Sequence, residues 1–80
     1  MGVKELPCDT GPKIRDVFVA FGWTARRSKS NHFVLTHPAH PNVYLSIPDH
    51  DEVRRNLLKA QIRNAKLTDQ QFCDMYDSMS

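Results

Sequence analysis

Apolar residues recur along the chain with two different spacings, and the spacing changes at points marked by glycine or proline. Between residues 10 and 21 they return every three to four positions, which predicts a helix with one apolar face. Thr10 can cap this helix, Pro12 fits its first turn, and Gly22 stands where a helix typically ends. The apolar face consists of Ile14, Val17, Phe18 and Phe21.

After Gly22, apolar and polar residues alternate in three short runs, a pattern typical of β-strands. The predicted strands cover residues 23–27, 32–36 and 43–47. The segment 37–42, with its two prolines, is predicted to be a turn. Phe33 and Leu35 fall on one face of the second strand, and His32 falls on the other. Because the links between them are short, the three strands should form an antiparallel meander.

Helical spacing returns after Pro48 and continues, with one interruption, to the end of the chain. Asp49 and Glu52 have the spacing of a capping box for a second helix, which is predicted to extend to about residue 66 and carries many basic residues. Thr68 and Gln71 repeat this signal for a last short helix. The apolar stripe of that helix consists of Phe72, Met75, Tyr76 and Met79.

Eighty residues make a single domain with a thin core. We predict a loose arm over residues 1–9, a folded domain over residues 10–66 and a helical extension over residues 67–80. The predicted fold class is α+β. A small three-stranded antiparallel sheet carries its helices on one face, in the order α-β-β-β-α, and a C-terminal helix follows.

The positive charge of the chain belongs to the domain and not to its C-terminal extension. Residues 1–66 contain eleven Lys and Arg against six Asp and Glu, whereas residues 67–80 contain three Asp and no basic residue. No apolar run approaches the roughly 20 residues that span a bilayer, and the N-terminus lacks the apolar core of a signal peptide. Cys8 and Cys73 match no metal or redox spacing, so we interpret them as free thiols of a cytoplasmic protein.

A histidine and a cluster of cations occur together around the start of the second predicted strand. Arg26, Arg27 and Lys29 could contact phosphate groups, and His32 can give or take a proton near neutral pH. RNA carries its own nucleophile, the 2′-OH, so its cleavage requires mainly proton transfer and stabilisation of negative charge. These residues therefore indicate ribonuclease chemistry at His32.

The same residues allow other interpretations. Lys and Arg also occur on solvated edge strands, where they block pairing with a second sheet. A non-catalytic RNA-binding module, or a protein that binds a partner through its acidic last helix, would need no reactive histidine. A zinc site made of His37, His40 and His50 is disfavoured, because two of these positions are stiffened by prolines and no thiolate lies close in sequence. We expect neither a metal nor another cofactor.

The order of these motifs resembles that of the HicA toxin family, over residues 12 to about 65. The shared positions are Gly22-Trp23, Ser30-Asn31-His32 where the family usually has Gly-Ser-His, His37-Pro38 and Ile47-Pro48. The resemblance implies a fold like that of the double-stranded-RNA-binding domain and a metal-independent endonuclease that cleaves messenger RNA. It gives His32 the catalytic role and implies a HicB-type antitoxin as protein partner. The residues expected to contact RNA are Arg26, Arg27, Lys29, Ser30, Asn31 and His37.

Two positions inside this region depart from the family pattern. Ser30 replaces a glycine, which could adopt unusual backbone angles, and Phe33 replaces a residue that is often a second histidine. Neither change removes the imidazole of His32. The extension 67–80 lies outside the pattern, and we hypothesise that its acidic helix packs beside the second helix and modulates RNA access. The oligomeric state stays open.

Overall fold

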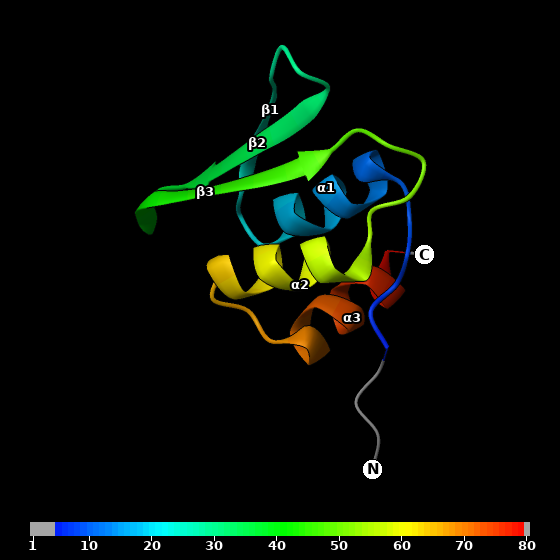
Figure 1. Ribbon diagram of the computed structural model, residues 1–80. Coiled ribbons are helices and arrows are strands. Elements are labelled where there is room, and N and C mark those ends of the chain that lie inside the picture. Colours follow the sequence, from blue (N-terminus) through cyan, green and yellow to red (C-terminus); the bar gives the residue numbers. More distant parts are fainter. Residues whose placement is uncertain (1–4, 80) are drawn as a thin grey trace.

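The computed structural model describes residues 5–79. In this part of the chain, three helices and three strands follow one another in the order α-β-β-β-α-α (Figure 1). The elements are α1 (Gly11–Ala20), β1 (Thr24–Arg27), β2 (His32–His37), β3 (His40–Pro48), α2 (Arg55–Asn64) and α3 (Asp69–Ser78). The predicted α+β fold class, with its element order and antiparallel meander, is confirmed.

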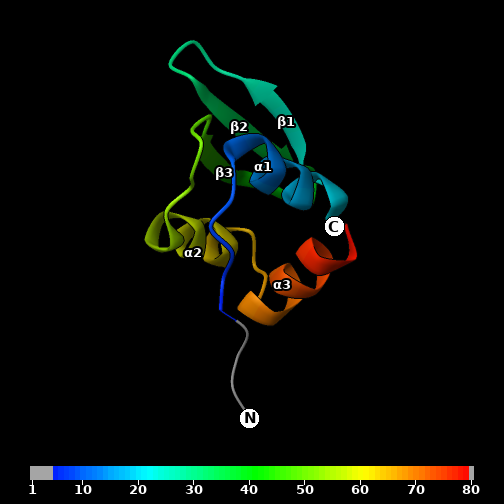
Figure 2. The same cartoon turned by 90° about the vertical axis from the view of Figure 1, so that its right-hand side faces the viewer.

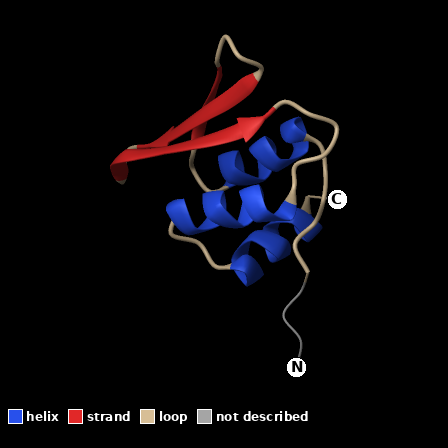
Figure 3. Cartoon of the chain, viewed as in Figure 1, coloured by secondary structure: helices blue, strands red, loops and turns tan. Residues whose placement is uncertain are grey.

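The helices cover one face of the sheet, whose strand order is β1-β2-β3 (Figure 3). Both α1 and α2 contact the sheet, and α3 packs against these two helices rather than on the open face of the sheet (Figures 1 and 2). A residue of α2 satisfies one backbone group on the outer edge of β3: the Ser46 N–H donates a hydrogen bond to the Gln61 side-chain oxygen at 3.0 Å. Because α3 packs on α1 and α2, it does not cover the outer face of the sheet, which carries Arg26.

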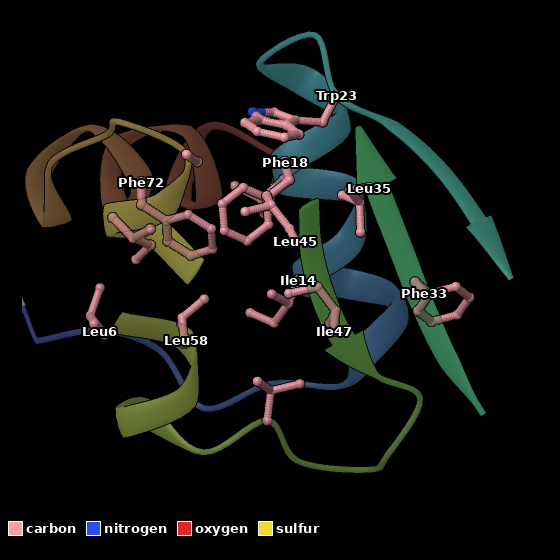
Figure 4. Close-up of a cluster of buried hydrophobic side chains, with 14 of the residues drawn as sticks. Leu6, Ile14, Phe18, Trp23, Phe33, Leu35, Leu45, Ile47, Leu58 and Phe72 are labelled. Carbon is pink, nitrogen blue, oxygen red and sulfur yellow. The ribbon is translucent and has the colours of Figure 1, made fainter. Parts of the chain in front are cut away.

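One apolar core lies between the sheet and the helices (Figure 4). Phe33 and Leu35 point into it from β2, as their alternation predicts, and both are buried. The ring of Phe18 in α1 packs against that of Phe72 in α3, with centroids 5.1 Å apart and planes tilted by 50°. Such tilted aromatic pairs add to the stabilisation from apolar burial. Of the predicted stripe of α3, Phe72 is buried in the same core as α1, Met75 and Tyr76 pack partly against it, and Met79 is exposed.

Local signals at three helix ends are confirmed. The Thr10 side chain accepts a hydrogen bond from the Lys13 N–H, and Thr68 forms a full capping box with Gln71. Gly22 follows α1 with φ of 97°, a left-handed conformation that glycine adopts without strain. These signals could be read from sequence because each involves residues within one turn of the helix end.

The segment before α1 packs against the helices from Glu5 onward, which differs from the loose arm expected over residues 1–9. Leu6 is buried, and its carbonyl accepts a hydrogen bond from the Arg55 guanidinium at 2.7 Å. The carbonyl of Asp9 accepts one from the Val53 N–H at 2.8 Å. A single apolar residue without periodicity gives no sequence signal for such packing. Residues 1–4 of the predicted arm lie outside the described residues.

A hydrogen bond from the Tyr76 hydroxyl to the Asp9 carboxylate ties this segment to α3. It lowers the pKa of Asp9 from its ordinary value of 3.8, with help from the Thr10 N–H. A carboxylate with a depressed folded-state pKa contributes stability that is present above its unfolded-state pKa and lost as the pH falls through the folded-state value.

Replacing Tyr76 by phenylalanine is therefore expected to lower the free energy of unfolding at pH 7 by about 1–3 kcal/mol, and by less below pH 4. Thermal unfolding of Tyr76→Phe and wild type at pH 7 and pH 3 tests this expectation. Tyr44→Phe is the matched control, because Tyr44 is 66% exposed. An equal loss at both pH values would rule out the ionised Asp9 carboxylate as the source of the stability.

The predicted turn over residues 37–42 is too long. β2 and β3 extend to His37 and His40, which pair across Pro38 and Ala39. The His37 Nδ1 accepts a hydrogen bond from the Ala39 N–H at 3.0 Å, which supports this tight turn. Pro41 is tolerated in β3 because β3 is an edge strand.

The predicted capping box of Asp49 and Glu52 is wrong. α2 begins at Arg55, and its N-cap residue Arg54 makes no side-chain capping bond. The Asp49 carboxylate instead pairs with the Arg27 guanidinium at 2.6 Å. Residues 49–54 are consequently a loop that connects β3 to α2 and carries its own histidine, His50.

Candidate functional site

His32 begins β2, and its backbone is paired with that of Pro48 at the end of β3. Its Nδ1 lies 2.7 Å from the Ser30 carbonyl oxygen. A carbonyl oxygen can only accept a hydrogen bond, so Nδ1 carries the proton of the neutral ring and Nε2 holds the lone pair. His32 can therefore accept a proton at Nε2, and can donate one from that atom when the ring is charged.

The residues just before His32 are held in a defined turn. Asn31 has φ of 57°, in the left-handed region that asparagine tolerates better than most residues. Its carbonyl accepts a hydrogen bond from the Asp49 N–H at 2.9 Å, and the Ser28 N–H donates to the His32 carbonyl at 2.8 Å. Ser30 is not among the described residues with positive φ. Serine at that position thus introduces no left-handed strain.

A pocket of about 350 Å³ lies beside His32. It is lined by His32, Pro48, His50, Glu52, Arg54 and Leu57. The ring of His50 lies 6.4 Å from that of His32, measured between centroids. The end of β3 and the loop before α2 thus bring a second imidazole to the same pocket.

Sequence reasoning missed His50 as a neighbour of His32 and weighed it only as a zinc ligand. The two residues are far apart along the chain, and His50 lies in a segment that had been predicted as the start of a helix. A signal was present in the antiparallel pairing of the second and third strands. That pairing sets Pro48 opposite His32 and so leaves His50 nearby.

The three cations of the basic cluster have different surroundings. Arg26 is exposed on the outer face of the sheet, in register with Val34, and Lys29 is exposed in the turn after β1. Neither forms an ion pair among the described residues. Arg27 instead pairs with Asp49. Arg26 and Lys29 are thus open to an anionic ligand, whereas Arg27 holds the loop that carries His50.

Phe33 faces the helices and not the pocket. The residue is 4% exposed, and the guanidinium carbons of Arg15 and Arg27 lie 4.7 and 5.5 Å from the centroid of its ring. Such cation–π contacts stabilise both partners. Phe33 and His32 lie on opposite faces of β2, and Phe33 is not among the residues that line the pocket beside His32.

His37 and His40 do not join His32, because they lie at the far end of β2 and β3. His37 lies five positions along the strand from His32, which corresponds to about 17 Å. Both rings pack on Trp23 instead, at 5.2 and 5.9 Å between centroids. Among the residues that the structure describes, no group of three or more His, Cys, Asp or Glu could hold a metal ion.

The chain is a small α+β protein with the layout of a double-stranded-RNA-binding domain. Its candidate site places His32 beside a pocket. The family model described as "HicA toxin of bacterial toxin-antitoxin" matches residues 11–67. The match covers more than half of the chain, and the protein belongs to this family. HicA toxins are generally messenger-RNA-cleaving toxins that pair with an antitoxin.

A search of curated proteins gave no match. The helix α3 lies beyond the family match, although Phe72 and Cys73 bury it in the common core. It packs against α1 as well as against α2, so the predicted position beside the second helix is observed. No helix in residues 5–79 has the length and apolar character required to cross a membrane.

Proposed function

We propose that this protein is a toxin that cleaves messenger RNA without a metal ion and uses His32 to transfer the proton. The observation that carries this proposal is the hydrogen bond between His32 Nδ1 and the Ser30 carbonyl. It leaves Nε2 as the nitrogen that exchanges protons with a substrate, on a residue that lines a pocket. Membership of the HicA family supports the same assignment.

The proposed reaction uses the nucleophile that RNA supplies. His32 Nε2 removes the proton from a 2′-OH, and the resulting oxygen attacks the neighbouring phosphorus. The bond from phosphorus to the 5′-oxygen then breaks and that oxygen takes up a proton from water or from an acid of the site, which gives a 2′,3′-cyclic phosphate and a 5′-OH end. A single proton-transfer group contributes about 10²–10⁴-fold to the rate, so the proposed enzyme is slow.

RNA contacts are assigned to the surface that adjoins His32. Arg26 and Lys29 carry the charge, Ser30 and Asn31 offer polar groups in the turn, and Arg27 acts mainly through the loop that it holds. His37 is retained only as a contact for a longer RNA segment, because it lies at the other end of the strand.

Replacing Arg26 or Lys29 by alanine is expected to weaken RNA binding and to lower the salt slope of the binding constant by about one for each lost phosphate contact. Fluorescence anisotropy with a labelled single-stranded RNA over a range of salt concentrations measures both quantities. Lys59→Ala is the control, because Lys59 lies on α2 and faces Asp69 at 3.9 Å. An Arg26→Ala variant with wild-type affinity and slope would remove that residue from the RNA surface.

The proposal includes a HicB-type antitoxin as the protein partner and the cytoplasm as the site of action, where messenger RNA is available. Induced expression in bacterial cells tests the toxin role. Growth should stop and reporter messenger RNA should become fragmented, and co-expression of a cognate antitoxin should reverse both effects. Continued growth with intact messenger RNA, at an expression level confirmed by immunoblot, contradicts the proposed function.

A further inference from the structure

We propose that His50 is the second proton-transfer residue of this site, the acid that protonates the leaving 5′-oxygen while His32 acts as the base. This inference rests on the proposed function, because it assigns a role within that reaction. It addresses a gap in the single-histidine scheme, since an alkoxide is a poor leaving group unless it receives a proton.

The geometry points to His50 because both imidazoles line one pocket. Their ring centroids are 6.4 Å apart, and no hydrogen bond joins the two rings among the described residues. Each ring is therefore available to a substrate group in the pocket of about 350 Å³. A base and an acid on either side of a phosphodiester are what an in-line displacement needs.

The loop that carries His50 is held by contacts to the start of α1 and to the residues around His32. The carbonyl of His50 accepts a hydrogen bond from the Gly11 N–H at 2.9 Å, which ties the loop to the start of α1. The preceding residue, Asp49, pairs with Arg27 at 2.6 Å and donates its N–H to the Asn31 carbonyl at 2.9 Å. Asn31 directly precedes His32, so one set of contacts fixes the relative position of the two histidines.

Two further charged side chains face this pocket. Arg54 brings a positive charge that can neutralise the scissile phosphate, and Glu52 brings a negative one. Asp49, which stands in the chain between the lining residues Pro48 and His50, adds an ion pair with Arg27. The pH dependence of cleavage therefore reflects the titration of His32 and His50 in the field of the charged side chains Arg27, Asp49, Glu52 and Arg54.

In the proposed step His32 takes up one proton and His50 gives up another. His32 Nε2 takes the 2′-OH proton as the bond from the 2′-oxygen to phosphorus forms. The bond from phosphorus to the 5′-oxygen breaks, and the 5′-oxygen takes a proton from the charged His50. The cycle ends with His32 charged and His50 neutral, and exchange with water restores both rings.

The test compares two versions of one RNA oligonucleotide, with either oxygen or sulfur as the bridging atom at the 5′ side of the scissile bond. A thiolate leaves without being protonated, so the sulfur substrate does not need an acid. We expect His50→Ala to slow cleavage of the oxygen substrate by about 10²–10⁴-fold. The same variant should cleave the sulfur substrate at close to the wild-type rate, whereas His32→Ala should be slow on both.

A second readout is the pH dependence of kcat/KM, which should lose its fall at high pH in His50→Ala. His50→Asn and thermal unfolding check that the loop remains folded, and His40→Ala controls for removal of an imidazole elsewhere. If His50→Ala cleaves both substrates at the wild-type rate, or loses the same factor on both, His50 is not the acid, and the proposed function still stands. If wild type cleaves neither substrate, the proposed function itself fails.

Discussion

Replacing His32 by alanine is expected to lower the rate of RNA cleavage by about 10²–10⁴-fold, because it removes the group that we propose takes the 2′-OH proton. The fold should tolerate the change. Among residues 5–79 the ring makes one hydrogen bond, to the Ser30 carbonyl at 2.7 Å, and a single bond of this kind contributes about 1 kcal/mol. Steady-state cleavage of a labelled messenger-RNA fragment, together with thermal unfolding of the same preparations, measures both effects.

The matched control for His32→Ala is His40→Ala, which removes an imidazole from the opposite end of the sheet, where the ring stacks on Trp23. This control should retain cleavage even if it loses some stability. A ribonuclease contaminant would give equal cleavage in all three preparations. If a well-folded His32→Ala protein, purified free of other nucleases, cleaves RNA at the wild-type rate, His32 has no part in the reaction.

Adding a single methyl group at Gly11 is expected to have the largest effect on stability. A Cβ there would lie 2.1 Å from the Pro48 carbonyl oxygen and 2.9 Å from the Asp49 Cα. Both neighbours are backbone atoms, so the strand end and the loop would have to shift. We expect Gly11→Ala to cost about 3–5 kcal/mol, a large part of the stability of a small domain.

Urea unfolding measures the loss in Gly11→Ala, and Gly22→Ala provides the comparison. Gly22 has φ of 97°, and an added Cβ would meet the end of the His37 side chain at 2.9 Å. That side chain can move, so the main cost is the left-handed backbone, about 1–2 kcal/mol. If Gly11→Ala were no more destabilising than Gly22→Ala, the close packing of α1 against the end of β3 would be disproved.

Much of the fold could be predicted because its signals are local. The alternation of Phe33 and Leu35 identified the buried face of β2, and the helical spacing of residues 14–21 identified the face of α1. Caps at Thr10 and Thr68 involve neighbours within one helical turn. Each of these features depends on contacts that the sequence itself places side by side.

The features that could not be predicted depend on contacts between distant segments. Leu6 is buried in the core and its carbonyl accepts a hydrogen bond from Arg55 of α2, which nothing in residues 1–9 indicates. Asp49 has the spacing of a helix cap, but its carboxylate pairs with Arg27 of β1, which is distant in sequence. His50 then stays in a loop and meets His32, so the candidate site has a second histidine that periodicity alone did not reveal.

The proposed reaction is tested most directly by cleavage of an RNA oligonucleotide in EDTA, with and without a single 2′-deoxy substitution at the mapped scissile nucleotide. We expect wild-type protein to cut the all-ribose RNA into a fragment with a 2′,3′-cyclic phosphate and one with a 5′-OH, and not to cut the 2′-deoxy RNA at that position. Cleavage of the 2′-deoxy RNA, 5′-phosphate ends, or loss of activity in EDTA would contradict a reaction in which His32 activates the 2′-OH of the substrate.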